Sequence, residues 1–556
     1  MAHHLEGPAG RGHTPEDAFT GAAGGAACGD LIRISLTIDA EDPEGRVNDA
    51  GFDASGCGAS IAAGSAAVSL VRGVGLLRAA QVGAEEIAQE LGGLSPSKRH
   101  AAELAADALH RALGEAAHRR AALAPTQGRT LVAMSGGVDS TVVALLVGGL
   151  EGPTWGSPQV VGSLKYPPPT VAGDGAQTEG DGAQTEVVGV TLELWSDPEN
   201  DGERSCCSAQ AVRGAREMAH RLGMAHFSID LRAEFRAGVV DHWLADHASG
   251  LTPNPCVRCN GNVRLDAMLD LAGRLGAQTL ATGHYARVVE EPLEEPLEPL
   301  EEPFEERFEE EPHALEKGFH EKRAANRGGE PASPHQASGP LLRVAADTSK
   351  DQSYALAALA PETLARLRFP LGELHKPEVR ELAERAGLEV ARKPDSQDLC
   401  FLAGTGLAPF LERHGRLGRR PGRIVDREGR ELGGHEGSHR FTVGQRHGLG
   451  IGGGDPLYVL STDARANTVT VGSREQLLTP TVRVREATLR RAGGRVDGVK
   501  VRSRGRRLPC RVVGEVGAGY HSLIEVELLE PVERTAPGQM ACLFAGELVV
   551  GHGTIT

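Results

Sequence analysis

The chain has 556 residues, more than a single hydrophobic core accommodates, so about three domains are expected. Its hydrophobic fraction of 40% is ordinary for a globular protein, and its longest apolar stretches, such as Thr141 to Leu150, are too short to span a bilayer. The N-terminus has neither the cationic start nor the apolar core of a signal peptide. We therefore expect a cytoplasmic protein without a membrane segment, whose nine cysteines are thiols.

The net charge of −16 is distributed unevenly along the chain. Residues 290–312 hold twelve glutamates and one arginine, a net charge of −11, so the rest of the chain carries only −5. Residues 481–511 hold eleven lysines or arginines against two acids, a net charge of +9. This basic run favours contact with the phosphate groups of a nucleic acid.

The first quarter of the chain predicts a small domain that follows a loose tail. Residues 1–27 are rich in Gly, Ala and His without a clear period, and we expect them to be disordered. Apolar residues alternate over 32–38, which predicts a half-buried strand, and Leu and Ala repeat at helical spacing over 101–113. Residues 28–124 are therefore expected to form an α+β domain that ends in a Pro- and Gly-containing breaker run.

From Thr130 onward, strands and helices alternate, which is typical of a parallel sheet covered on both faces. The expected strands are 131–134, 187–194 and 279–282, and the expected helices are 141–150, 209–222, 234–248 and 263–275. We assign a catalytic domain to 128–360, a helical continuation to 361–414, a central β domain to 415–475 and a C-terminal β-barrel to 476–556. Two insertions of low complexity, 151–186 and 290–340, are predicted to be disordered.

The strongest chemical signal is the segment Ala-Met-Ser-Gly-Gly-Val-Asp-Ser at 133–140, between a buried strand and a helix. Its glycines let backbone amides approach an anion, and the helix N-terminus and the hydroxyls of Ser135 and Ser140 add donors. The loop lacks the Lys-Ser/Thr ending of a Walker loop, so cleavage between the β- and γ-phosphates is not expected. The pattern predicts a pyrophosphate site in which Asp139 helps to hold Mg²⁺.

This loop resembles that of the N-type ATP pyrophosphatases, which adenylate a substrate and release pyrophosphate. Four further motifs follow in order, Thr-Pro-Asn-Pro-Cys-Val-Arg-Cys-Asn at 252–260, Thr-Gly-His-Tyr at 282–285, Lys-Asp-Gln-Ser-Tyr at 350–354 and Asp-Ser-Gln-Asp-Leu-Cys-Phe at 395–401. Together they make residues 129–556 resemble the bacterial tRNA-specific 2-thiouridylase family. The resemblance implies an α/β fold with a parallel-sheet catalytic domain like that of the adenine nucleotide alpha hydrolases.

The resemblance also implies the reaction. ATP would adenylate O2 of the wobble uridine, position 34 of the tRNA, with release of AMP and pyrophosphate, and a cysteine persulfide would deliver sulfur. Cys400 would carry the persulfide and Cys259 would be the nucleophile and disulfide partner, which fits the cleavage of a persulfide by a second thiol. Cys256 stands where some relatives have an aspartate, so Cys256, Cys259 and Cys400 are alternatively three ligands of an iron–sulfur cluster or of zinc.

The resemblance implies two sets of contact residues. Those for ATP are Ala133, Met134, Ser135, Gly136, Gly137, Val138, Asp139, Ser140, Leu192 and Gly283. Those for the anticodon arm of the tRNA are His284, Lys350, Asp351, Gln352 and Gln539. Asn254, Pro255 and Cys256, beside the expected nucleophile, are candidates for the pocket of the base, and Arg502 and Ser503 of the basic run would extend the contact with tRNA. Cys206 and Cys207 are expected to be structural.

Three short motifs near the N-terminus resemble those of the NifU/IscU-type iron–sulfur scaffold domain. They contain Cys28 and Asp30, then Cys57, and then His100. The family uses three cysteines and an aspartate, and Ala101 stands where the third cysteine is expected. Cys28, Asp30, Cys57 and His100 therefore form a candidate site for Zn²⁺ or an iron–sulfur cluster. The alternative is a domain that only docks a cysteine desulfurase or another sulfur carrier.

Two other classes of function remain open from the sequence. One is a scaffold or carrier of iron–sulfur clusters whose ATP site is vestigial. The other is a ligase of the ATP pyrophosphatase type that acts on a small molecule, against which the pair of distant cysteines argues.

Overall fold

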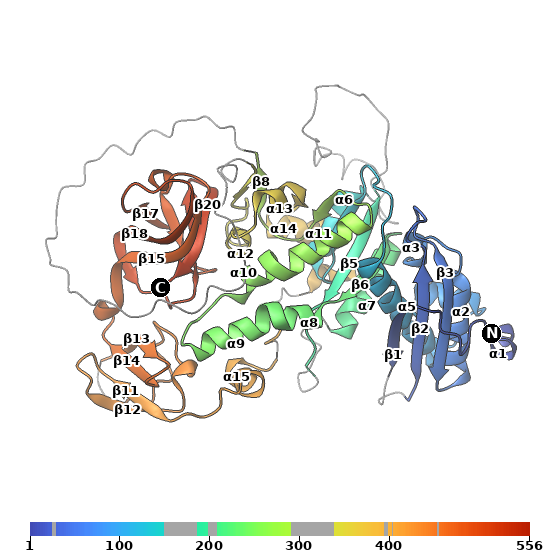
Figure 1. The fold of residues 1–556 in the computed structure, drawn as a ribbon, viewed down its shortest axis with the longest axis horizontal. Helices are drawn as coiled ribbons and strands as arrows, with labels where there is room; N and C mark the ends of the chain where they lie inside the picture. Colours follow the sequence, from blue (N-terminus) through green and yellow to red (C-terminus); the bar gives the residue numbers. More distant parts are fainter. Residues whose placement is uncertain are drawn as a thin grey trace, which may run out of the picture.

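The computed structural model describes residues 1–24, 29–149, 186–197, 208–290, 339–393, 399–402, 404–452 and 455–556. Figure 1 shows an N-terminal α+β unit packed beside a central parallel sheet, with two β modules at the opposite end of the molecule. No helix within the described ranges is long and apolar enough to cross a membrane. The α/β fold class expected for the chain is confirmed.

The N-terminal unit is a three-stranded antiparallel sheet in the order β1-β2-β3, with α2 and α5 packed against it. Its elements are α1 (Ala2–Glu6), β1 (Phe19–Gly24), β2 (Leu31–Ile38), β3 (Val47–Ser55), α2 (Gly58–Val71), α3 (Leu76–Ala79), α4 (Ala84–Glu90), η1 (Pro96–Lys98) and α5 (Arg99–Arg119). Alternating side chains of β2 are buried, as the sequence predicts, because one face of the sheet lies under the helices.

The prediction that residues 1–27 form a disordered tail is wrong for residues 1–24. β1 pairs with β2 along its whole length, and the Nδ1 of buried His4 lies 2.9 Å from the Oγ of Ser65. A Cβ on Gly21 would lie 2.1 Å from the carbonyl oxygen of Ala108, so α5 crosses β1 where only glycine fits. The same small residues that permit this packing make the segment look featureless in the sequence. Residues 25–28 lie outside the described part of the chain.

The central sheet has five parallel strands in the order β10-β7-β4-β5-β6. The elements of this region are β4 (Thr130–Ala133), α6 (Val138–Gly148), β5 (Val187–Glu193), α7 (Ala209–Arg221), β6 (Ala225–Asp230), α8 (Arg232–Phe235), η3 (Arg236–Val240), α9 (Asp241–Ala248), α10 (Pro255–Cys259), η4 (Asn260–Arg264), α11 (Leu265–Arg274), β7 (Thr279–Ala281), β8 (Arg287–Val289), β9 (Leu341–Arg343), α12 (Ser353–Leu356), α13 (Pro361–Arg366), β10 (Leu367–Arg368), α14 (Lys376–Arg385), η6 (Glu389–Arg392) and α15 (Leu407–Gly415). Expected strands correspond to β4, β5 and β7, while β6 and β10 were not predicted.

Two of the expected segments contain strands that the sequence does not predict. The segment 361–414 is not purely helical, because β10 within it pairs in parallel with β7 and completes the central sheet. The catalytic segment 128–360 also contributes β8 and β9 to another sheet, since β9 pairs with β20 of the C-terminal module. The two insertions, 151–186 and 290–340, lie almost entirely outside the described residues.

Two β modules complete the chain, as the sequence predicts. The first is a four-stranded sheet in the order β12-β11-β14-β13. The second closes a six-stranded antiparallel barrel through the pairing of β15 with β20. Their elements are β11 (Gly422–Val425), β12 (Glu431–His435), η7 (Ser438–Arg440), β13 (Tyr458–Asp463), β14 (Thr468–Gly472), η8 (Glu475–Leu477), β15 (Leu478–Leu489), η9 (Gly493–Arg495), β16 (Gly498–Lys500), β17 (Leu508–Val512), β18 (Gly519–Glu533), β19 (Met540–Ala545) and β20 (Leu548–Ile555).

Candidate active site

The loop between β4 and α6 has the geometry of an anion-binding nest. Gly136 has φ +67°, a left-handed conformation that glycine adopts without strain. The Oγ of Ser140 accepts from the Ser135 amide at 3.1 Å and donates to the Gly137 carbonyl oxygen at 3.1 Å, which closes the loop. α6 begins directly after it, so the first amides of that helix remain available to an anion.

Two lysines from distant parts of the chain meet this loop. The Nζ of Lys376 donates to both carboxylate oxygens of Asp139, at 2.7 and 2.8 Å, and the Nζ of Lys393 donates to the Gly136 carbonyl oxygen at 3.1 Å. The Tyr285 hydroxyl donates to Asp139 at 2.9 Å. Two ammonium groups therefore lie beside the glycine-rich loop, and the Asp139 carboxylate neutralises one of them.

Sequence reasoning missed both lysines, because they follow their partners by 237 and 257 residues. One signal was available for Lys376, which is the first residue of α14 and is followed by a proline. A cation at a helix N-terminus opposes the helix dipole, so a lysine at that position indicates a requirement other than helix stability.

The other predicted nucleotide contacts lie around the loop. A Cβ on Gly283 would lie 3.2 Å from the Asp139 Cβ and from the Ser140 amide, so the chain after β7 abuts the first turn of α6. Leu192 is buried on β5, the strand beside β4. Ala133, Met134 and Val138 are buried, so any contact from them to a ligand comes mainly from the backbone.

Cys259 is the last residue of α10, which is capped by the Asn254 side chain accepting from the Cys256 amide at 3.0 Å. The helix then widens into the π-helical segment η4, where the Asn260 amide group donates to the Ala355 carbonyl oxygen at 3.3 Å. Such π-helical turns are frequent at functional sites. Cys256 is exposed, yet desolvation by the surrounding chain raises the pKa of its thiol, which makes it a poorer nucleophile at neutral pH.

Cys400 and Cys259 pack against the same apolar cluster. Beside Cys400, the buried ring of Phe401 contacts the ring of Trp243 with a centroid distance of 5.2 Å. Trp243 belongs to α9, which continues from η3, and η3 packs against α10, the helix of Cys259. The structure thus brings the two segments that carry the predicted catalytic thiols to one cluster. Residues 394–398 of the predicted motif lie outside the described residues.

The three thiols Cys256, Cys259 and Cys400 are not gathered as a ready ligand set. Among the described residues, the His, Cys, Asp or Glu side chains whose ligand atoms lie close enough together to hold a metal ion are Asp30, Cys57 and His100, in the N-terminal unit. Cys206 and Cys207 lie outside the described residues.

Several predicted tRNA contacts hold the fold together. Asp351 accepts from the amides of Ala345 and Ser353 at 3.2 Å, its side chain is only 6% exposed, and it lies 3.6 Å from the Nζ of Lys500. The Gln352 Oε1 accepts from the Tyr285 amide at 2.9 Å. The Gln539 amide group donates to the Thr252 carbonyl oxygen and so ties the loop before α10 to the barrel.

His284 is the predicted tRNA residue that the structure supports least. It is buried, its Nδ1 lies 2.8 Å from the Thr282 Oγ1, and burial lowers its pKa to about 3. The imidazole is therefore neutral and offers tRNA neither a charge nor an open surface. Arg502 and Ser503, in contrast, are exposed in the loop between β16 and β17, Lys350 is half-buried, and Pro255 is buried.

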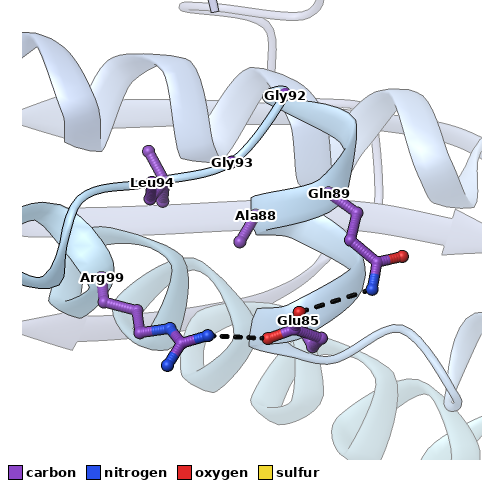
Figure 2. Close-up of a pocket in the computed structure, with 7 residues that line it drawn as sticks. All are labelled: Glu85, Ala88, Gln89, Gly92, Gly93, Leu94 and Arg99. Carbon is purple, nitrogen blue, oxygen red and sulfur yellow. Dashed lines mark hydrogen bonds and ion pairs between the residues drawn. The ribbon is translucent and has the colours of Figure 1, made fainter.

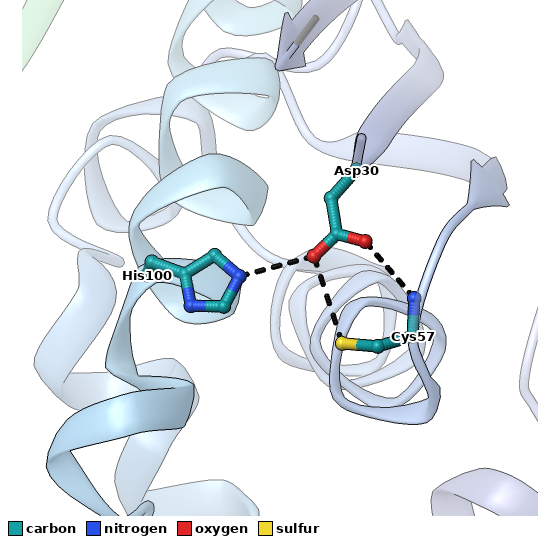
Figure 3. A group of neighbouring side chains, drawn as sticks. All are labelled: Asp30, Cys57 and His100. Atoms are coloured by element: carbon teal, nitrogen blue, oxygen red, sulfur yellow. Dashed lines mark hydrogen bonds and ion pairs between the residues drawn. The ribbon is translucent and has the colours of Figure 1, made fainter. Parts of the chain in front are cut away.

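A second site lies in the N-terminal unit, where Asp30, Cys57 and His100 point toward one another (Figure 3). The Oδ2 of Asp30 lies 3.0 Å from the His100 Nε2 and 3.6 Å from the Cys57 Sγ, and the Cys57 amide donates to Oδ1 at 2.9 Å. The hydrogen bond from His100 is the main reason that the pKa of Asp30 is below its ordinary value. Ala101 is fully buried, and Cys28, the fourth predicted ligand, lies outside the described residues.

A recess of about 340 Å³ in the N-terminal unit lies along α4 and the start of α5 (Figure 2). In it, Glu85 accepts from Arg99 at 3.1 Å and from Gln89 at 3.4 Å, so its polar groups satisfy one another. None of the predicted site residues lines it.

Comparison with known proteins places four family models on the chain. They are the "NifU-like N terminal domain" at 1–122, the "tRNA methyl transferase HUP domain" at 178–404, the "tRNA methyl transferase PRC-barrel domain" at 409–473 and the "Aminomethyltransferase beta-barrel domain" at 492–555. The first of these begins at residue 1, in agreement with the ordered α1 and β1.

Relatives match over most of their lengths. The "Bifunctional protein NifU/MnmA" of Rubrobacter xylanophilus is 39% identical, with 100% of this chain and 97% of the relative covered. The "tRNA-specific 2-thiouridylase MnmA" of Geobacter metallireducens and that of Rhodospirillum centenum are each 36% identical. Their matches cover 77% and 78% of this chain, and 96% and 92% of the relatives.

Proposed function

The chain belongs to the tRNA-specific 2-thiouridylase family, in the form that carries a NifU-like domain at its N-terminus, and from this premise we propose a mechanism for its residues. It is a tRNA sulfurtransferase enzyme. The proposal is that it thiolates C2 of the wobble uridine, position 34, after ATP has adenylated O2. The observation that carries it is the convergence of Lys376 and Lys393 on the loop Ser135–Ser140.

The loop and its lysines supply what adenylation needs. The uridine O2 attacks the α-phosphorus of ATP, and pyrophosphate leaves with the negative charge that has developed on it. The backbone amides after Gly136 and the ammonium groups of Lys376 and Lys393 stabilise that charge. Asp139 is the residue that we assign to Mg²⁺, whose hard oxygen preference suits a carboxylate and which would neutralise phosphate charge when bound.

The cysteines supply the sulfur transfer. The terminal sulfur of a Cys400 persulfide attacks C2 and displaces AMP, which leaves the base joined to Cys400 through a disulfide-type bond. The Cys259 thiolate then attacks the Cys400 sulfur, 2-thiouridine departs, and a Cys259–Cys400 disulfide remains. An external dithiol must reduce that disulfide, and a sulfur donor such as a cysteine desulfurase must reload Cys400, before the next turnover. The contact of Phe401, the residue after Cys400, with Trp243 of α9, and the packing of the adjoining η3 against the helix of Cys259, support this pairing.

Thiolation in vitro with ATP, Mg²⁺, a desulfurase and tRNA tests the mechanism. Cys400→Ser and Cys259→Ser are each expected to lower 2-thiouridine formation by at least about 100-fold, since a lost nucleophile removes a covalent step. Cys256→Ser is the comparison variant from the same helix; because it keeps a small polar side chain, we expect it to change mainly the KM for tRNA and to keep most of the rate at saturating tRNA. Full activity of Cys400→Ser would remove the persulfide role. Loss of activity in Cys256→Ser together with cluster absorbance would favour the iron–sulfur alternative.

We further propose that tRNA is held by the exposed basic loop around Arg502 and Ser503 and by the loop Thr252–Cys256. Arg502→Ala is expected to raise the KM for tRNA and to leave the KM for ATP unchanged, because it removes a phosphate contact. The slope of log affinity against log salt should also fall by about one. Equal effects on both KM values would argue against this placement.

The N-terminal site favours a second candidate activity, the holding of a metal ion or cluster. Its ligand atoms all lie within 4.8 Å of one another, and a thiolate, an imidazole and a carboxylate suit zinc. We expect the full-length protein to bind one Zn²⁺ equivalent in this domain and His100→Ala to lose it, with the thiolation machinery unchanged. Zinc content that does not change in His100→Ala would leave this domain with a docking role only.

A further inference from the structure

The N-terminal unit and the catalytic unit share a continuous buried interface. α5 packs along β6, the edge strand of the parallel sheet, and one apolar cluster extends from the N-terminal sheet into the catalytic core (Figure 1). A Cβ on Gly114 of α5 would lie 1.9 Å from the Ser228 carbonyl oxygen, so the helix and strand backbones touch. Motion of α5 relative to β6 is therefore sterically restricted.

A buried ion pair ties α5 to α7. The Asp107 carboxylate, 10% exposed, accepts from the Arg213 Nε at 2.6 Å and from Arg216 at 2.5 Å, and the Arg216 side chain is 5% exposed. Both arginines belong to α7 of the catalytic unit. Because the carboxylate binds two cations through separate oxygens, it fixes the rotation of α7 as well as its position.

α7 in turn packs against the Ser135–Ser140 loop. At Gly136, an added Cβ would lie 2.9 Å from the Ala211 carbonyl oxygen and 3.7 Å from the Ala215 amide, both on α7. The loop thus rests directly on the helix that Asp107 holds. A shift of α7 of even a few tenths of an ångström changes the space in which Gly136 and its amides sit.

A second path reaches the loop from His110 of α5. Its ring nitrogens face the carbonyl oxygens of Val82 at 2.9 Å and His226 at 3.0 Å. The His226 Nε2 lies 2.8 Å from the Thr191 Oγ1, and that hydroxyl donates to the Met134 carbonyl oxygen at 2.9 Å. Since the hydroxyl donates to Met134, it accepts from His226. Met134 is the residue that enters the Ser135–Ser140 loop.

We propose that the N-terminal domain is a structural part of the ATP site: through Asp107 and His110 of α5 it positions the loop Ser135–Ser140 for nucleotide binding. These two are positioning residues, because they act through α7, His226 and Thr191 and contact no substrate. The inference rests on the proposed assignment of ATP to this loop. It gives the fused domain a role in nucleotide binding that is separate from any role in sulfur or metal handling.

Calorimetric titration of ATP into the full-length protein tests the inference. Asp107→Asn removes the charge that holds the two arginines and is expected to raise the Kd for ATP about 5- to 30-fold, within the range of coupling between sites. Asp107→Glu keeps the carboxylate and should restore part of the affinity. Asp49→Asn is the charge-matched control on the outer strand β3, where Asp49 pairs with His13 and Arg72, and its Kd should stay within about twofold of the wild type.

The kinetic signature separates positioning from a general loss of structure. Asp107→Asn should raise the KM for ATP while the KM for tRNA and the kcat at saturating ATP stay close to wild type. Linkage requires the converse effect, so saturating ATP should slow amide exchange in α5 of the wild type. If Asp107→Asn does not fold, Arg213→Lys tests the inference instead, because lysine keeps the positive charge but lacks the planar guanidinium that binds the carboxylate. Its Kd for ATP should rise about two- to fivefold, near the lower limit of such coupling.

Two failures are distinguishable. If the wild type does not bind ATP, the proposed function is wrong. If the wild type binds ATP and the folded Asp107→Asn and Arg213→Lys proteins bind it equally well, the positioning role of the N-terminal domain is refuted, whatever their thermal stability.

Discussion

Replacement of Lys376 by methionine is expected to remove most ATP-dependent thiolation and to leave the fold intact. The Lys376 side chain is 9% exposed, and its Nζ donates to both oxygens of Asp139 at 2.7 and 2.8 Å. Methionine keeps most of the apolar stem in place and removes only the charge. What the variant loses is therefore the ammonium beside the loop.

The magnitude follows from the contact that is lost. A hydrogen bond to a charged group contributes about 1.5–3 kcal/mol, and each 1.36 kcal/mol corresponds to a factor of ten in rate. If Lys376 stabilises the departing pyrophosphate, kcat/KM for ATP should fall about 10- to 150-fold. Asp139 is 30% exposed, so water takes over part of the lost pairing and the loss of folding stability should stay below about 3 kcal/mol.

Initial rates of 2-thiouridine formation at varied ATP concentration measure the effect, with thermal unfolding in parallel. Lys376→Arg keeps the charge and should retain more activity than Lys376→Met. The double variant Lys376→Met/Asp139→Asn removes both charges and should recover stability without recovering activity. A Lys376→Met enzyme whose kcat/KM for ATP lies within twofold of the wild type refutes the role in adenylation. Full recovery of activity in the double variant would reduce Lys376 to a partner that merely neutralises Asp139.

Three further outcomes are expected. Gly136→Ala puts an alanine at a position with φ +67° and places its Cβ 2.9 Å from the Ala211 carbonyl oxygen. The KM for ATP should therefore rise about tenfold or more, whereas tRNA binding, measured by filter retention, should be unchanged. Gly21→Ala places a Cβ 2.1 Å from the Ala108 carbonyl oxygen, so the melting temperature should fall by several degrees. The control is Gly73→Ala, which should lower the melting temperature less, because no atom lies within 4 Å of the added Cβ and only the left-handed backbone is strained. Burial lowers the pKa of His284 to about 3 in the folded protein, against about 6.5 in the unfolded chain, so the folded state binds fewer protons between these values. The free energy of unfolding is therefore unaffected by the titration of this residue above pH 6.5, and it falls by up to about 1.4 kcal/mol per pH unit as the pH drops from 6.5 toward 3. Chemical denaturation at pH 7.5 and 5.0 should show a smaller pH dependence in His284→Gln than in the wild type, and an equal dependence contradicts the buried neutral state.

Local patterns in the sequence were sufficient for the conformation of the loop between β4 and α6. A strand, two glycines and a helix start are adjacent in the chain, so the left-handed Gly136 and the hydrogen bond from the Ser135 amide to the Ser140 Oγ follow from short-range geometry. The strands β4, β5 and β7 were predicted for a similar reason, because strands buried on both faces are continuous apolar runs.

The same local reasoning failed where packing decides conformation. β1 is rich in glycine and alanine because α5 approaches it closely, and β10 has only two residues whose strand conformation depends on pairing with β7. Neither segment carries a periodic apolar pattern, so the information that orders them lies in their partners.

What the sequence by itself determined about this protein is its set of chemical groups: the glycine-rich anion loop, the thiols at 259 and 400, and the Asp30, Cys57 and His100 side chains. Only the tertiary structure decided which groups meet. It brought Lys376 and Lys393 to the loop, buried the His284 imidazole, and packed α5 so that Asp107 binds the two arginines of α7. The physical reason is that turns and helix ends are encoded by neighbouring residues, whereas contacts across hundreds of residues depend on how buried faces fit together.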